Sequence, residues 1–270
     1  MITSKQDWFT KELEDAGVLV GGGESIAEKL LLDKTQVTFR FATSPNSSWM
    51  HFLTVGFGQQ YSSNYEKNIF SRLSELGVRE LFPDLKILFY SDHRSGSFRI
   101  HFGHLWESVS AIELQKKFFD VDPSFIGQSG NVKPINKSVN DLFQLWSRSY
   151  LNPYCVVNDV DALVTSTRPS KIIELKRPVE TISDWKPYRN DLANYQRSKE
   201  LANIIKSNIV NIAYNLDRPT GGQVQLFTIP EKKDNSTEIT YSKIVTNSKE
   251  AIEYILDRNQ LTLVSDSSQR

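Results

Sequence analysis

The chain has 270 residues, of which 39% are hydrophobic and 24% are charged, so it can build a sizeable core and does not have the composition of a disordered protein. Lysine plus arginine and aspartate plus glutamate each number 32, which gives a formal net charge of zero. Such a chain has no overall positive field, so a nucleic-acid partner would have to be met by a local basic patch.

The single cysteine, Cys155, excludes an internal disulfide and any zinc site built from cysteines. It lies in an apolar run, which favours a small buried residue over a nucleophile. No stretch approaches the roughly 18 apolar residues of a membrane span, and the N-terminus is too charged for a signal peptide. We therefore expect a cytoplasmic protein that has no membrane partner.

The first half of the chain alternates helical and extended patterns. Hydrophobic periodicity predicts helices at 5–16, 24–32, 65–76 and 106–119, and strands at 36–42, 50–56, 85–90 and 97–102. Three glycines at 21–23 lack the lysine and the spacing of a phosphate-binding loop and predict a tight turn. The segment 120–135 is rich in Gly, Pro, Ser and Asn and is the expected boundary. We expect 1–135 to form an α+β region for recognition or dimerisation, and 136–270 to form a separate core.

The second half contains most of the candidate chemistry. Its patterns predict helices at 137–148, 188–206 and 248–257, and strands at 154–165, 171–177, 209–214, 223–229 and 239–245. Between residues 165 and 207 the sequence has nine basic and five acidic residues, whereas residues 1–33 have three basic and seven acidic. This asymmetry permits a local basic patch.

Two of these strands bring charged residues into apolar surroundings. Because side chains alternate along a strand, Asp159 and Asp161 are expected to share one face, and Glu174 and Lys176 are expected to share one face of the next strand. Charged groups in such strands need partners or a metal, because it is expensive to bury them unpaired. The pattern therefore predicts one polar centre on a sheet, although a buried ion pair without chemistry is an alternative.

A Mg²⁺ ion fits this set of residues, because Mg²⁺ binds oxygen ligands and commonly uses one or two carboxylates with water and substrate phosphate. The candidate ligands are Asp161, Glu174 and the backbone carbonyl of Leu175. The ion would polarise a phosphodiester and help to deprotonate water, and Lys176 could orient the attacking water. Mn²⁺ is expected to substitute for Mg²⁺.

This arrangement resembles the PD-(D/E)xK superfamily of restriction-endonuclease-like nucleases. Asp161 matches the metal aspartate, and Glu174-Leu175-Lys176 matches the E-x-K element on the next strand. Val160 stands where the family pattern has proline, and Asp159 remains a rival for the metal role. The resemblance covers about 137–229 and implies an α/β protein whose core is a mixed, mostly antiparallel sheet flanked by helices.

Further site residues are implied by the same resemblance. The helix after the E-x-K strand often contains a supporting Gln or Tyr, and here Gln196 and Tyr195 occupy that place. Members of the family often add an acidic residue from a helix before the first core strand, for which Asp141, Glu107 and Glu66 are candidates.

The function implied is Mg²⁺-dependent hydrolysis of DNA phosphodiester bonds, as in a restriction or defence endonuclease that acts as a homodimer. RNA remains open as the substrate, because these residues would contact phosphates, and a Holliday-junction resolvase is a further option. The alternative from another class is a non-catalytic nucleic-acid-binding or assembly module that retains the nuclease fold.

Overall fold

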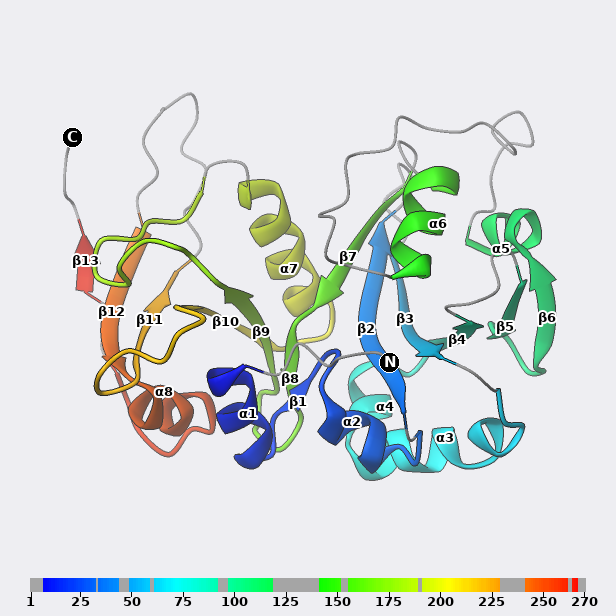
Figure 1. The fold of residues 1–270 in the computed structure, drawn as a ribbon, viewed down its shortest axis with the longest axis horizontal. Coiled ribbons are helices and arrows are strands. Elements are labelled where there is room, and N and C mark those ends of the chain that lie inside the picture. Colours follow the sequence, from blue (N-terminus) through cyan, green and yellow to red (C-terminus); the bar gives the residue numbers. More distant parts are fainter. Residues whose placement is uncertain are drawn as a thin grey trace. The chain divides into compact units, whose positions relative to one another are not determined.

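The computed structural model of the protein divides into two compact units (Figure 1). It describes residues 7–32, 34–43, 49–58, 61–91, 97–118, 141–151, 155–188, 191–228, 241–261 and 264–266. Unit 1 contains Gly21–Asp159, and unit 2 contains Gln6–Val20 together with Val160–Arg270. Unit 1 is thus inserted between two segments of unit 2. The boundary expected at 120–135 lies outside the described residues, and the contacts divide the chain after Asp159 instead.

Within the described residues, unit 1 is built on a six-stranded mixed sheet with the order β6-β5-β4-β3-β2-β7. The strands are β2 (Thr35–Thr43), β3 (Trp49–Phe57), β4 (Lys86–Ser91), β5 (Ser97–His101), β6 (Glu107–Ser110) and β7 (Val156–Val160). The helices are α2 (Glu24–Lys29), α3 (Asn64–Glu75), α4 (Val78–Leu81), α5 (Ala111–Phe118) and α6 (Leu142–Tyr150). Strands β3 and β4 are parallel and are connected through α3 and α4, whereas β2–β3, β4–β5 and β5–β6 are antiparallel.

The single helix predicted at 106–119 is wrong in its first part, because residues Glu107–Ser110 form strand β6 and the helix begins at Ala111. Ser110 and Glu113 explain the start of the helix. The Ser110 hydroxyl accepts the backbone N–H of Glu113, and the Glu113 carboxylate accepts the backbone N–H of Ser110. This is a capping box, which fixes a helix N-terminus and leaves the preceding residues free to pair with β5.

Unit 2 is built on a second mixed sheet, seven-stranded within the described residues, with the order β1-β8-β9-β10-β11-β12-β13. The strands are β1 (Leu19–Val20), β8 (Ala162–Val164), β9 (Lys171–Lys176), β10 (Asn208–Tyr214), β11 (Gln223–Phe227), β12 (Tyr241–Asn247) and β13 (Val264–Asp266). The helices are α1 (Trp8–Asp15), α7 (Leu192–Ile204) and α8 (Ser248–Ile255). Strands β9 and β10 are parallel, and α7 connects them.

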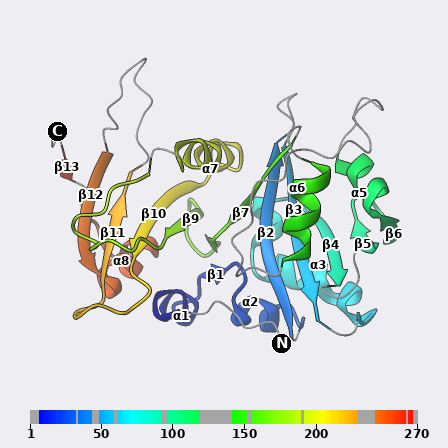
Figure 2. The same ribbon diagram turned by 45° about the horizontal axis from the view of Figure 1, so that its top comes forward.

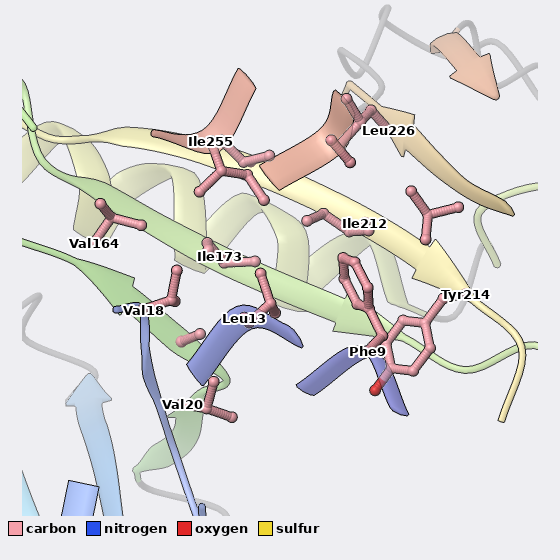
Figure 3. Packing of buried hydrophobic residues seen from close by; sticks show 14 residues of the cluster. Phe9, Leu13, Val18, Val20, Val164, Ile173, Ile212, Tyr214, Leu226 and Ile255 are labelled. Atoms are coloured by element: carbon pink, nitrogen blue, oxygen red, sulfur yellow. The ribbon is translucent and has the colours of Figure 1, made fainter. Parts of the chain in front are cut away.

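The two faces of the unit 2 sheet pack against different helices. Figure 3 shows Phe9 and Leu13 of α1 and Ile255 of α8 against Ile173 and Ile212 of the sheet. Helix α7 lies beside β9 and β10 in both ribbon views (Figures 1 and 2). Residues of α1 therefore complete a core that is otherwise built from the second half of the chain, a long-range association that the sequence did not indicate.

The segment 154–165, predicted as one strand, is divided into two strands that belong to different sheets. Strand β7 ends at Val160 and pairs with β2 in unit 1, whereas β8 begins at Ala162 and pairs with β1 and β9 in unit 2. Asp161 is the residue between them. In the described part of the chain no helix combines the length and the apolar character that a membrane span requires.

A buried ion pair crosses the interior of unit 1. The guanidinium of Arg40 and the carboxylate of Asp141 are each 1% exposed and form a direct ion pair. Asp141 also accepts the Tyr90 hydroxyl at 2.9 Å and the backbone N–H of Phe143, and it caps α6. Burial alone would raise the pKa of Asp141, but the charge and the hydrogen bonds of Arg40 hold it below its ordinary value.

We expect Asp141→Asn to lower the free energy of unfolding at neutral pH by about 3 kcal/mol, because it leaves the Arg40 charge buried with less compensation. The folded-state pKa of Asp141 lies below its unfolded value, so its contribution is present above the unfolded value and is lost as the pH falls through the folded value. Urea unfolding at pH 7 and in acid should therefore show that the difference in free energy of unfolding between wild type and Asp141→Asn becomes smaller in acid.

The matched control is Lys11→Ala, which removes an ion pair whose side chains are 61% and 64% exposed. Exposed pairs of this kind contribute about 0–1 kcal/mol. An Asp141→Asn effect no larger than that of the control, or one that grows in acid, would contradict the assignment.

Candidate functional site

Strands β8 and β9 place Asp161 beside Glu174. The antiparallel register pairs Ala162 with Ile173, so Asp161 is opposite Glu174 one step further along. At this step the backbone ladder has ended, and the Asp161 carboxylate accepts the backbone N–H of Leu175 at 2.7 Å. A side chain thus replaces a strand partner at the end of the ladder and holds the carboxylate against β9.

Glu174 is buried beneath α7, and two groups contact its carboxylate. The ammonium of Lys176 lies 2.9 Å from Glu174 Oε1, and Ser198 of α7 donates a hydrogen bond to it. Burial raises the pKa of Glu174, and the nearby positive charge of Lys176 offsets only part of this effect. Glu174 is therefore easier to protonate than an exposed glutamate.

Lys176 is held by charges and by an aromatic ring. Its ammonium lies 3.3 Å from Asp191 Oδ2 and 5.0 Å from the centre of the Tyr195 ring. Burial alone would lower the pKa of Lys176, but the carboxylates of Glu174, Asp191 and Asp161 together raise it above its ordinary value. Lys176 is therefore a fixed cation at neutral pH.

Asp191 has this role because of its place at the start of α7. It occupies the N-cap position, yet its side chain makes no capping hydrogen bond to the helix backbone. The carboxylate is instead directed to Lys176. The parallel β9–α7–β10 connection brings the first turn of α7 near the end of β9, which contains Glu174 and Lys176.

A second network lies at Arg177, the residue after Lys176. Arg177 Nε donates to the Tyr214 hydroxyl at 2.6 Å and lies 3.0 Å from Asp7 Oδ2. The Tyr214 hydroxyl in turn donates to Asp7 at 2.7 Å, and Asp7 is the N-cap of α1. The start of α1 is thereby attached to the end of β9 and to the end of β10.

The structure brings together only part of the predicted set. Asp161, Glu174, Leu175 and Lys176 lie together at the end of β9. Asp159, expected on the same face as Asp161, belongs to unit 1, where its carboxylate lies 2.9 Å from Arg40 Nε and accepts a hydrogen bond from Gln144. The shared face is therefore a wrong prediction, because the strand that was expected to connect the two aspartates is interrupted between them.

Tyr195 and Gln196 were the two helix residues expected to support the site. The Tyr195 ring is fully buried and contacts Lys176, whereas Gln196 is half-buried at the next position.

The three upstream acidic candidates are ion-pair partners within unit 1: Asp141 with Arg40, Glu107 with Lys117 and Glu66 with Arg99. Cys155 is also in unit 1, where burial raises its pKa to about 12 and so makes it inert as a nucleophile at neutral pH.

Asp191, Ser198 and Asp7 were missed by the sequence reasoning. An acidic residue immediately before a helix is a recognisable N-terminal pattern, and it could have indicated Asp191 and Asp7. Nothing local distinguishes Ser198, whose role depends on which face of α7 covers the sheet.

The oxygen atoms at the end of β9 decide whether this site fits a divalent cation. Within the described residues no group of three or more His, Cys, Asp or Glu side chains is placed to hold a metal ion. Two carboxylates, Asp161 and Glu174, are nevertheless adjacent in register, and the C=O of Leu175 leaves its strand on the same side as the N–H that Asp161 accepts. Such a set fits Mg²⁺, which keeps several waters and needs only one or two carboxylates.

Asn211 of β10 lies next to Glu174 in the sheet. It is in register with Glu174 and is 2% exposed. Its Oδ1 atom is buried and has no hydrogen-bond partner among the described residues. A buried amide oxygen of this kind is usually satisfied by an ordered water or an ion. The sheet face under α7 can therefore accept one more hydrogen-bond donor or a cation at Asn211 Oδ1.

Comparison of the chain with protein-family models, with curated proteins and with solved structures finds no match. The groups that determine the chemistry of this site are two carboxylates, one fixed ammonium and a backbone carbonyl at the end of a parallel strand.

We expect Lys176→Met to raise the pKa of Glu174 further above its ordinary value, because the substitution removes the positive charge that offsets burial. Carboxyl-carbon NMR titration measures this directly, with Glu174→Gln to assign the resonance. Lys199→Met is the matched control, because Lys199 is exposed on α7, the helix that covers Glu174. This substitution should leave the pKa of Glu174 unchanged. A pKa of Glu174 that falls or stays constant in Lys176→Met would show that the two groups do not interact as described.

Proposed function

We propose that this protein is a Mg²⁺-dependent nuclease that hydrolyses phosphodiester bonds of DNA, with its centre at Asp161, Glu174 and Lys176. The observation that carries the proposal is the juxtaposition of Asp161 and Glu174 in register, with the Lys176 ammonium 2.9 Å from the Glu174 carboxylate. The resemblance of Asp161 and Glu174-Leu175-Lys176 to the PD-(D/E)xK pattern supports the same assignment.

Each residue has a role that its surroundings support. Asp161 is positioned by the N–H of Leu175 and would supply one carboxylate ligand, while Glu174 and the Leu175 carbonyl would supply the others. When bound, a Mg²⁺ ion would supply Lewis-acid polarisation of the phosphate and a more acidic water. Lys176 remains protonated and would stabilise negative charge that develops on the phosphate.

The acidic neighbours of Lys176 have a consequence for substrate binding. In the structure the ammonium is shared between Glu174 and Asp191. Lys176 would keep its contact with Asp191 when Glu174 serves as a metal ligand, and its ammonium would then offset negative charge on a bound phosphate. Exposed Lys186, in the connection between β9 and α7, would hold a flanking phosphate.

Homodimerisation and a restriction or defence role follow from the same resemblance and form part of the proposal, as does the use of Mn²⁺ in place of Mg²⁺.

One observation favours the second candidate, a non-catalytic nucleic-acid-binding or assembly module. The described residues bring together fewer than three side chains of the metal-ligating kinds, and a module that only binds would need none.

The deciding experiment is cleavage of supercoiled plasmid, linear duplex, single-stranded DNA and structured RNA with Mg²⁺, with Mn²⁺ and with EDTA. We expect metal-dependent cutting that falls by on the order of 100-fold or more in Asp161→Ala, which removes a metal ligand, and in Lys176→Ala, which removes the cation that stabilises charge on the phosphate. DNA binding in Ca²⁺ should persist in both variants, since the flanking basic residues are unchanged.

Lys11→Ala is the matched control, because it removes a lysine from an exposed ion pair on α1 and should leave cutting unchanged. Cutting that continues in excess EDTA would exclude the metal-dependent mechanism. A folded protein that binds DNA and cuts none of the four substrates would favour the binding module.

A further inference from the structure

The sheets of the two units have the same order of elements, although the sequence shows no internal repeat. In unit 2 an antiparallel pair, β8–β9, leads through α7 to the parallel strand β10, and two antiparallel strands, β11 and β12, and then α8 follow. In unit 1 the antiparallel pair β2–β3 leads through α3 and α4 to the parallel strand β4, and β5, β6 and then α5 follow. Both series can be followed in Figure 1.

The hydrogen-bonded registers allow the two series to be aligned residue by residue. The parallel ladder of unit 2 begins with Lys171 opposite Asn208, and that of unit 1 begins with Phe52 opposite Lys86. When these two ladders are superimposed from their first pairs, the position of Glu174 is occupied by Val55.

The other two positions follow from the same alignment. Lys176 corresponds to Phe57, two residues after Val55. Asp161, which is opposite Glu174, corresponds to Val37, the antiparallel partner of Val55. The three charged positions of unit 2 are therefore apolar in unit 1.

The alignment also matches the two faces of each sheet. In unit 1, Phe52 packs with Leu114 of α5 and Phe143 of α6. In unit 2, the residue aligned with Phe52 is Lys171. Lys171 lies on the sheet face that α8 covers, where its ammonium donates to the carbonyl of Ile255. Because side chains alternate, Val55 lies on the opposite face from Phe52, as Glu174 lies opposite to Lys171. A shift of the alignment by two residues would put Leu53 or Phe57 in place of Glu174, so the position of Glu174 is apolar at each of these offsets.

Strands β2 and β3 of unit 1 supply no carboxylate, and the arginine of β2, Arg40, is buried in its ion pair with Asp141. Strands β2 and β3 contain no aspartate, glutamate or lysine in their 18 positions, 35–43 and 49–57. Aromatic rings take their place near the end of β3: the Phe57 ring centre lies 5.6 Å from that of Tyr61, and the Tyr61 ring centre lies 5.7 Å from that of Phe89. Neither β2 nor β3 therefore supplies a carboxylate at the positions aligned with Asp161 and Glu174.

From these observations we infer that unit 1 is a second, non-catalytic copy of the unit 2 fold, so that each chain has a single cutting centre. The inference rests on the proposed nuclease function of unit 2. One chain then hydrolyses one strand at a time, and a double-strand break requires two chains or two successive encounters.

The test is product analysis on supercoiled plasmid, with wild-type protein compared with Glu174→Ala in Mg²⁺. A single centre predicts that Glu174→Ala loses nicked and linear products together, each by about 100-fold or more. If unit 1 contained a second centre, Glu174→Ala would become a nicking enzyme, with nicked circles accumulating as linear product disappears. That result would overturn the inference.

Phe57→Leu is the matched control in unit 1, because it replaces the residue aligned with Lys176 by another apolar one and should leave the nicking rate unchanged. A loss of nicking in Phe57→Leu equal to that in Glu174→Ala, with both variants unfolding in the same urea range as wild type, would also overturn the inference. Absence of any cutting by wild-type protein would instead contradict the proposed function, and the single-centre inference would fall with it.

Discussion

The hydrogen bond from the N–H of Leu175 to the carboxylate of Asp161 ends the β8–β9 ladder and determines much of what surrounds it. The side chain satisfies a strand N–H that has lost its backbone partner, so the chain can leave the sheet at this residue without an unsatisfied donor. The residues before it, β7, pair in the other sheet. The same bond sets one carboxylate beside Glu174 at the end of β9.

The second constraint is the burial of Glu174 and Lys176 under α7. An isolated charge at this depth would be strongly unfavourable, and the structure compensates with Ser198, Asp191 and the Tyr195 ring. The compensation is incomplete, because the pKa of Glu174 remains raised. An incompletely satisfied carboxylate is costly for folding, and such strain is commonly retained where function requires it. The aligned strands of unit 1 contain apolar residues at these positions and avoid the cost.

The sequence predicted the parts of this account that depend on local pattern. Alternation along 171–177 placed Glu174 and Lys176 on one face, and periodicity located the helix that follows within a few residues. The mixed α/β character and the helices that flank the sheets were also predicted and are confirmed. The restriction-endonuclease-like core remains a prediction from the resemblance.

What could not be predicted depends on pairing between distant residues. The two-residue strand β1 is too short to be recognised from sequence, yet its pairing with β8 brings α1 into unit 2. The interruption at Asp161 and the pairing of Asp159 with Arg40 are likewise set by tertiary partners, since 154–165 reads locally as one continuous strand. The equivalence of the two units exists only in strand order and register, which a search for repeated sequence does not detect.

The most direct test of the centre is a crystal structure of the protein with Mn²⁺ and a short DNA duplex, in which anomalous scattering locates the ion. We expect an ion bound within about 2.0–2.6 Å of oxygen atoms from Asp161 and Glu174, with Lys176 turned toward a phosphate. An ion bound elsewhere on a protein that cuts the duplex, with Glu174 still paired to Lys176, would contradict this expectation.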